Sequence, residues 1–171
     1  MINIKDLIRD VPDFPKPGIL FKDITPVLSS PEAFDTVTDA LMGISRSLGA
    51  DKVIGVESRG FILGTPVALG LGLPFVPVRK PGKLPCETVR AEYELEYGTD
   101  TLEMHTDALE AGDRVIIIDD LLATGGTAEA TIKLVESQGA VVAGVLVMIE
   151  LCFLNGADRI DPHNVYSLVR Y

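Results

Sequence analysis

Two adjacent carboxylates, Asp119 and Asp120, are followed closely by a turn of small residues, Thr124-Gly-Gly-Thr. The apolar run 115–118 before them is typical of a strand buried on both faces of a parallel sheet. Small residues between a strand and a helix let backbone N–H groups converge on a phosphate, which the helix dipole also favours. Carboxylates beside such a turn suit a ligand that also carries hydroxyl groups or magnesium. The segment therefore predicts a ribose 5-phosphate site, with helix capping as the alternative role of the carboxylates.

Two further polar clusters follow expected strands. Glu57-Ser-Arg-Gly comes after the strand expected at 52–56, and Arg79-Lys-Pro-Gly-Lys comes after the strand expected at 75–78. Each cluster can bind a phosphate group through its cations, although a capped turn with a surface arginine and a solvated basic loop are the simpler interpretations. Ligands bind outside the carboxyl ends of parallel strands. Taken with the carboxylate pair, the two clusters favour a sugar that carries anionic groups at both ends.

Apolar periodicity outlines alternating strands and helices. Ser30, Pro31 and Glu32 form an N-terminal capping pattern for a helix that Gly49 closes, and the apolar spacing over 4–11 indicates a short amphipathic helix. The other expected elements are a helix at 61–69, a helix after Gly126 that runs to Gln138, strands at 52–56, 75–78, 115–118, 141–149 and 165–169, and an antiparallel pair, 89–95 with 101–105, across a turn at Gly98. This alternation predicts an α/β fold with a mainly parallel, twisted sheet flanked by helices.

Composition narrows the class of protein. The 171 residues suffice for one well-cored domain, and 25 acidic against 15 basic residues leave a formal charge of −10, which disfavours a nucleic-acid-coating role. Cys86 and Cys152 form no C-x-x-C pair, so neither a disulfide framework nor a zinc site is expected. The longest apolar run, 141–149, is much shorter than the ~18 residues that a membrane span requires. We expect a soluble, cytoplasmic, single-domain protein without nucleic-acid or membrane partners.

The chain contains neither a G-x-x-x-x-G-K-[ST] phosphate loop nor a G-x-G-x-x-G turn. A P-loop nucleotide hydrolase and a dinucleotide-dependent dehydrogenase are therefore not supported. An Asp-phosphorylated signalling domain also carries an Asp pair at a strand end, but that pair lies near the N-terminus of such chains. Here the pair lies two-thirds along the chain and leads into Thr124-Gly-Gly-Thr.

The segment 115–127 resembles the motif with which type I phosphoribosyltransferases bind 5-phosphoribosyl pyrophosphate (PRPP). The resemblance extends over nearly the whole chain. It includes Phe14-Pro-Lys-Pro-Gly-Ile-Leu-Phe-Lys-Asp-Ile, Glu57-Ser-Arg-Gly-Phe, Arg79-Lys-Pro-Gly-Lys-Leu-Pro, Leu95-Glu-Tyr-Gly and Asp119-Asp-Leu-Leu-Ala-Thr-Gly-Gly-Thr. Within the family, the Leu-Leu pair, the Leu-Glu-Tyr-Gly segment and the N-terminal Pro-Gly-x-x-Phe segment are similar to those of the members that act on adenine.

The resemblance implies a purine-salvage glycosyltransferase that converts adenine and PRPP into AMP and pyrophosphate. It implies inversion at the anomeric carbon through an oxocarbenium-like transition state, Mg²⁺ that arrives with PRPP, no metal cage in the protein, and a homodimer. It also implies a mobile hood, at about residues 80–106, that closes over the reacting groups.

Site roles follow from the same resemblance. Asp119 and Asp120 match the pair that holds the ribose hydroxyls. The 5-phosphate loop matches Ala123, Thr124, Gly125, Gly126 and Thr127, and the pyrophosphate site matches Ser58, Arg59, Arg79, Lys80 and Lys83, with Arg79 reaching in from a neighbouring subunit. Adenine binding is implied for Leu20, Phe21 and Lys22, and hood roles for Glu96 and Tyr97. The implied catalytic residues are Glu96, which handles the purine proton, and Arg59, Asp119 and Asp120.

The sequence also departs from the family pattern. Lys22 stands where many relatives carry Arg, and Glu57 stands where others carry Asp, which could alter how Arg59 is held. Cys86 and Arg90 lie in the hood without an assigned role. From the residues alone, Phe21 also fits a core position. The alternatives left open are a 6-oxopurine or orotate phosphoribosyltransferase and a non-catalytic PRPP-sensing regulator on the same fold.

Overall fold

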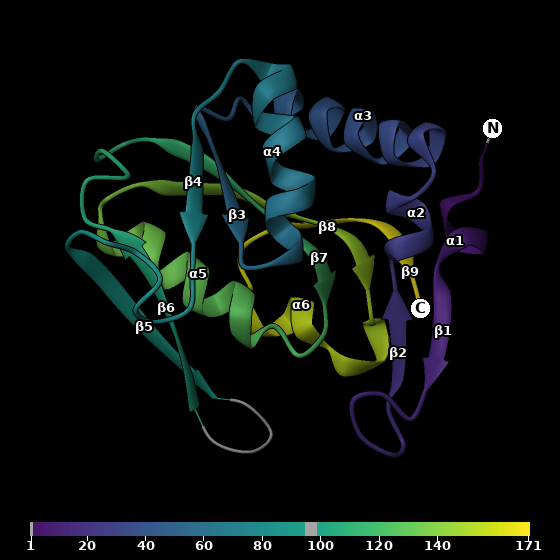
Figure 1. Cartoon of the computed structure of the whole chain (residues 1–171). Coiled ribbons are helices and arrows are strands. Elements are labelled where there is room, and N and C mark those ends of the chain that lie inside the picture. The colour runs from purple at the N-terminus through teal and green to yellow at the C-terminus, as the bar shows by residue number, and fades with distance from the viewer. Residues whose placement is uncertain (1, 95–98) are drawn as a thin grey trace.

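The computed structural model describes residues 2–94 and 99–171, and its centre is a five-stranded parallel sheet (Figure 1). The strand order is β4-β3-β7-β8-β9, and every neighbouring pair in it is parallel. The strands are β3 (Lys52–Val56), β4 (Phe75–Val78), β7 (Arg114–Leu122), β8 (Val141–Glu150) and β9 (Val165–Arg170). The predicted α/β class with a mainly parallel sheet is confirmed.

Helices cover both faces of this sheet, as its continuous apolar strands require. The helices α3 (Pro31–Ser47) and α4 (Arg59–Leu71) pack on one face against Ile116 and Ile118 of β7. On the other face, α5 (Gly126–Ser137) belongs to a second apolar cluster that includes Ile117 of the same strand. Successive side chains of β7 thus point to opposite layers, which gives the sheet two separate cores.

Local capping explains where the long helices begin and end. The Ser30 side chain accepts a hydrogen bond from the Ala33 amide at 3.3 Å, and Pro31 occupies the first turn of α3, as predicted. Helix α4 starts at Arg59, two residues before the predicted start at Phe61, and ends at Gly72 in the left-handed conformation. Pro66 lies inside α4 without ending it.

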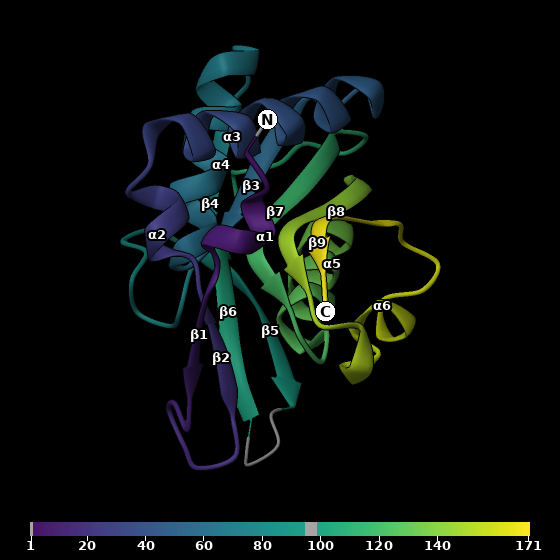
Figure 2. The same ribbon diagram turned by 90° about the vertical axis from the view of Figure 1, so that its right-hand side faces the viewer.

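Two antiparallel hairpins project from the sheet in the same direction (Figures 1 and 2). In the first, β1 (Arg9–Pro12) pairs with β2 (Leu20–Asp23). The helix predicted over 4–11 is correct only for α1 (Ile4–Leu7), because Val11 pairs with Phe21 in this hairpin. In the second, β5 (Thr88–Glu94) pairs with β6 (Thr99–His105), which confirms the predicted strand pair, while the turn at Gly98 lies outside the described residues.

Short helical turns complete the chain. They are α2 (Thr25–Leu28), the 3-10 turn η1 (Cys152–Leu154) and α6 (Gly156–Arg159). Of the helices in the described part of the chain, none has the length and apolar character that crossing a bilayer requires.

Candidate active site

The phosphate-loop candidate leaves β7 at Leu122, four residues later than the predicted strand end at Ile118. Asp119 and Asp120 therefore lie within the strand, near its carboxyl end, and Asp120 is buried with 4% of its surface exposed. The loop then turns at Gly125, whose φ of +82° a residue with a side chain rarely adopts, and α5 begins at Gly126. The first N–H groups of α5 have no partner within the helix and face this turn.

A segment that the sequence did not point to supports the loop from behind. A Cβ atom on Gly156 would lie 2.2 Å from the carbonyl oxygen of Ala123, and one on Gly125 would lie 2.5 Å from the carbonyl oxygen of Gly156. The two backbones pack together with no space for a side chain. The Asn155-Gly156 dipeptide, with Asn155 at a φ of +53°, is the turn signal that would have located this support.

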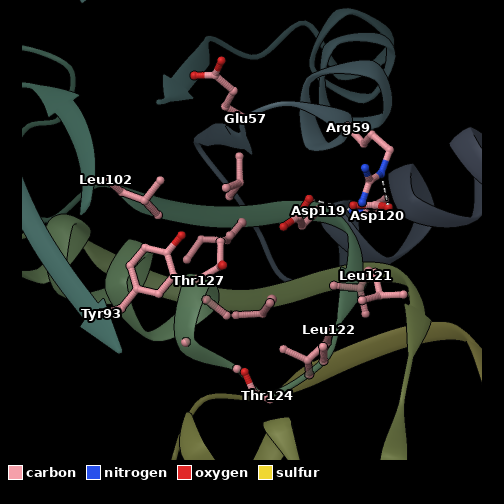
Figure 3. Close-up of a pocket in the computed structure, with 18 of the residues that line it drawn as sticks. Glu57, Arg59, Tyr93, Leu102, Asp119, Asp120, Leu121, Leu122, Thr124 and Thr127 are labelled. Carbon is pink, nitrogen blue, oxygen red and sulfur yellow. Dashed lines mark hydrogen bonds and ion pairs between the residues drawn. The ribbon is translucent and has the colours of Figure 1, made fainter. Parts of the chain in front are cut away.

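Gly60 brings the first basic cluster to the carboxylates. A Cβ atom there would lie 2.6 Å from the carbonyl oxygen of Ile118 and 3.2 Å from Oδ1 of Asp119. Only glycine lets the first turn of α4 approach the end of β7 so closely. Because of this approach, Ser58 and Arg59 line the same cavity as the acidic pair, and Arg59 lies above Asp120 in Figure 3.

Arg59 forms an ion pair with Asp120, in which Nε donates to Oδ2 at 2.6 Å (Figure 3). Burial by itself would lower the pKa of Arg59, but the carboxylates of Asp120 and Asp119 outweigh that effect and raise it. The guanidinium also lies 5.5 Å from the centre of the Phe21 ring. Arg59 thus links the acidic pair to the segment that was expected to bind the base.

Asp119 has a carboxyl group whose pKa is strongly raised. Burial raises its pKa well above the ordinary value of 3.8, and the neighbouring charge of Asp120 raises it further, against the Asp120 amide and Arg59, which lower it. The Asp120 amide donates to Oδ1 of Asp119 at 2.9 Å. A ligand that brings a cation or hydroxyl donors would favour the charged form of this carboxyl group.

These residues line one cavity of about 350 Å³, within the size range of small-molecule sites. Tyr93 and Leu102 face the carboxylates from the second hairpin, with Thr127 beside Tyr93 and Thr124 at the lower side of the cavity in the view (Figure 3). The predicted residues that line it are Ser58, Arg59, Lys80, Asp119, Asp120, Ala123, Thr124, Gly125, Gly126 and Thr127. Tyr93, Leu102 and Leu122 were not foreseen, since apolar residues in a strand carry no signal of a site.

A second, more apolar cavity of about 710 Å³ adjoins the first and shares Arg59, Ala123 and Thr124 with it. Its other lining residues are Lys16, Gly18, Ile19, Leu20, Phe21, Lys22, Leu121, Leu151, Phe153 and Leu154. The three residues expected to bind the base are therefore together in one cavity. Phe21 is half-buried at this cavity and meets the Phe14 ring edge-on at 5.2 Å, so a core position does not describe it.

Comparison with known proteins identifies the family of the chain. A phosphoribosyl transferase domain model matches residues 23–169. The adenine phosphoribosyltransferase of Solibacter usitatus is 56% identical over 100% of this chain and 99% of its own length. The crystal structure of adenine phosphoribosyltransferase from Thermoanaerobacter pseudethanolicus has a TM-score of 0.96 at 52% identity and covers 98% of both chains. The chain belongs to the adenine phosphoribosyltransferase family.

A structure from Saccharomyces cerevisiae extends the comparison to a liganded relative. This adenine phosphoribosyltransferase, complexed with adenine and an imino-altritol bisphosphate, has a TM-score of 0.93 at 41% identity and covers 97% of this chain and 96% of that one. Family membership therefore rests on both sequence and fold over almost the whole length of the chain.

In this member of the adenine phosphoribosyltransferase family, Lys80 is the cation of the second basic cluster that reaches the polar cavity. Its ammonium group pairs with Asp100 of β6, which also accepts a hydrogen bond from the Tyr93 hydroxyl at 3.0 Å. Burial would lower the pKa of Lys80, but the hydrogen bond to Asp100 raises it. Lys80 therefore stays charged while it connects the cavity to the second hairpin.

Arg79 and Lys83 do not line the cavity of their own chain. Arg79 instead donates to both carboxylate oxygens of Glu57, at 3.1 and 3.2 Å, and to the Lys83 carbonyl at 3.1 Å. Glu57 also accepts the Lys80 amide at 3.1 Å. The Glu57 side chain thus holds Arg79 and the start of the hood, and none of its hydrogen bonds to described residues goes to Arg59.

Several expected residues have other positions or contacts. Lys22 borders the apolar cavity, yet its ammonium group binds Asp10 at 2.5 Å. Glu96 and Tyr97 lie outside the described residues. Arg90, without an assigned role, pairs with buried Glu103 at 2.7 Å. Cys86 is exposed.

The donor set of the polar cavity is compatible with magnesium that arrives on a substrate. In the described part of the chain, no group of three or more His, Cys, Asp or Glu side chains is arranged to hold a metal ion. Asp119 and Asp120 do present carboxylate oxygens, the kind of ligand that Mg²⁺ prefers, to the same cavity. These oxygens would contact an ion that keeps its phosphate and water ligands.

Proposed function

We propose that the chain transfers the phosphoribosyl group of PRPP to adenine and releases AMP and pyrophosphate, as a glycosyltransferase of purine salvage. The observation that carries this proposal is the junction of two cavities at Arg59, Ala123 and Thr124. One cavity has the acidic pair and the phosphate loop, and the other has apolar walls with Phe21. A sugar phosphate in the first and a flat base in the second would meet at their shared edge. Residues 1–171 act together as a single domain.

The polar cavity positions the sugar. The backbone N–H groups of residues 124–127 bind the 5-phosphate at the start of α5, and Asp119 and Asp120 accept the ribose hydroxyls. Both carboxylates then lie close to the carbon that becomes positively charged as pyrophosphate leaves. Their negative charge stabilises that oxocarbenium-like state.

The departing pyrophosphate needs positive charge at the opposite side of the sugar. Ser58, Arg59 and Lys80 line that part of the cavity, and both cations keep raised pKa values after the opposing effect of burial. Asp119 and Asp120 line the same cavity and are the carboxylates that would hold Mg²⁺ carried by PRPP, an ion that would supply further charge neutralisation.

The hood excludes water during the reaction, because an oxocarbenium-like sugar also reacts with water. Tyr93 and Leu102 of the second hairpin already line the polar cavity, which supports this role. Glu96 and Tyr97 lie outside the described residues, and we assign Glu96 to proton handling at the purine.

A homodimer would complete the pyrophosphate site. Arg79 and Lys83 do not line their own cavity, which fits a role of Arg79 in the cavity of a neighbouring subunit. Helix α4 exposes Ile62 and Leu69, with 43% and 82% of their surfaces accessible, one heptad apart on one face. Such an apolar stripe suits an interface with a second copy.

We further propose a cytoplasmic enzyme without nucleic-acid or membrane partners, consistent with its charge of −10.

The test is to incubate the purified chain with PRPP, Mg²⁺ and single bases, and to measure nucleotide and pyrophosphate. We expect AMP from adenine. Turnover of hypoxanthine or orotate in place of adenine would reject the base assignment. Binding of PRPP without turnover of any base would favour the sensing regulator. Omission of Mg²⁺ should abolish turnover.

A further inference from the structure

The two walls of the apolar cavity come from parts of the fold that are not joined by strand pairing. One wall is β2, which pairs with β1 in a separate two-stranded sheet. The other wall follows β8 and contains Leu151, Phe153 and Leu154. The width of the cavity therefore depends on the side-chain contacts that hold the first hairpin against the main sheet.

Lys22 of β2 makes one of these contacts. Its side chain is buried, with only 7% exposed, and its ammonium group lies 3.8 Å from the centre of the Tyr171 ring. Its other partner, Asp10, is on the paired strand of the same hairpin and is 54% exposed. Tyr171 is thus the group outside the hairpin that holds the Lys22 charge. A cation over an aromatic ring in a desolvated place is a stabilising contact.

Tyr171 holds the second wall through its backbone. Its amide donates to the Glu150 carbonyl at 3.0 Å, and its carbonyl accepts the Cys152 amide at 2.9 Å. These two bonds bracket Leu151, whose own amide donates to the Leu122 carbonyl at 2.9 Å beside the phosphate loop. One residue therefore contacts β2 with its ring and fixes the opposite wall with its main chain.

We infer that Lys22 and Tyr171 form a pair of positioning residues that set the distance between the two walls of the base cavity. This inference rests on the proposed function, since it assigns the apolar cavity to adenine. Lys22 then acts on the base through Tyr171 and through the backbone of β2.

The first experiment separates the substrates kinetically. Lys22→Met and Tyr171→Leu should each raise KM for adenine by about tenfold, as expected for a cation–aromatic contact in a desolvated site. KM for PRPP should stay within about twofold, since the polar cavity is formed by other elements. Lys22→Arg and Tyr171→Phe, which keep the cation and the ring, should stay within about twofold of the wild type for both substrates.

Lys5 offers a matched control. Its ammonium group lies 4.5 Å from the centre of the same Tyr171 ring, but Lys5 belongs to α1 and its hydrogen-bond partner is the Arg170 carbonyl. Lys5→Met removes an equal charge from the ring without releasing β2. It should leave KM for adenine unchanged.

The double variant Lys22→Met/Tyr171→Leu tests whether the two residues act as a pair. Its KM for adenine should match that of either single variant, because the contact can be lost only once. A KM for adenine in the double variant equal to the product of the two single effects would overturn the pairing. In the single variants, an equal rise of KM for adenine and PRPP, or an unchanged KM for adenine, would overturn it as well. If the wild type does not turn over adenine, the proposed function itself fails. Thermal unfolding of each variant identifies any variant that does not fold.

Discussion

The polar and apolar cavities adjoin, yet they are built in different ways. The polar cavity takes its acidic pair and phosphate loop from one continuous segment, 119–127, at the end of a central strand. The apolar cavity is assembled from three segments, 16–22, 121–124 and 151–154, together with Arg59, and these parts are far apart in the chain. If the proposed function holds, the sugar-phosphate chemistry would depend on a local strand-loop-helix unit. The choice of base would instead depend on how a separate hairpin packs against the main sheet.

The largest effect is expected from the acidic pair. Asp119→Asn or Asp120→Asn should lower turnover at least about tenfold, ~1.4 kcal/mol of activation free energy, because the amide no longer balances the charge that develops on the sugar. Steady-state rates at saturating PRPP and adenine measure this loss, and circular dichroism checks that both variants fold. Full activity in both variants would contradict the role of this pair in the polar cavity.

The support behind the phosphate loop gives the next effect. Gly156→Ala places a Cβ atom 2.2 Å from the Ala123 carbonyl oxygen, so the loop must shift. We expect a free energy of unfolding lower by about 1–3 kcal/mol and a KM for PRPP raised by roughly fivefold. Denaturant unfolding and initial rates measure the two quantities.

Gly43→Ala is the control for that substitution, since a Cβ atom there has no neighbour within 4 Å. It should leave KM for PRPP unchanged. It should alter the free energy of unfolding by no more than about 1 kcal/mol, the ordinary difference between Gly and Ala in a helix. A Gly156→Ala enzyme with normal KM for PRPP would show that the loop tolerates the shift, and that the polar cavity is not shaped by this support.

Phe21→Leu should separate the two cavities. Loss of the ring should raise KM for adenine by about fivefold, because an aromatic contact contributes a binding free energy of about 1 kcal/mol. KM for PRPP should stay nearly unchanged. Phe14→Leu is the control, because Phe14 touches the Phe21 ring but is 51% exposed. Equal changes of both KM values in Phe21→Leu would mean that the cavities do not act independently.

The smallest effect concerns stability and pH. Burial first, and then the Asp120 charge, raises the pKa of Asp119 in the folded protein above the ordinary value of 3.8. The folded state therefore binds the proton of this carboxyl group more tightly than the unfolded state does. The resulting stabilisation of the folded state is fully present below pH 3.8 and is lost as the pH rises through the folded pKa. Asp119→Asn should therefore raise the unfolding temperature of the unliganded protein at pH 7 by about 2 °C, with a smaller gain near pH 4. A variant that is less stable than the wild type at pH 7 would contradict this sign.

Much of the fold was predictable because its signals are local. The Ser30 cap, the apolar strand 115–118 and the hairpin of 88–94 with 99–105 depend on residues that are near one another in the chain. The first hairpin was missed because the spacing over 4–11 fits a helix, whereas Val11 pairs with Phe21 across a loop. Local periodicity cannot show that a strand will find its partner ten residues later.

The sequence by itself determined the strand-loop-helix unit with its carboxylates and phosphate loop, since a strand end, small residues and a helix start are all specified within 119–127. The tertiary structure decided the rest. It placed Gly156 against Ala123, engaged Arg79 with Glu57 and brought Phe153 opposite β2. These are contacts between segments that meet only when the hairpin and the sheet pack together. No residue type or spacing within a single segment encodes them, because their energy comes from close packing across the fold.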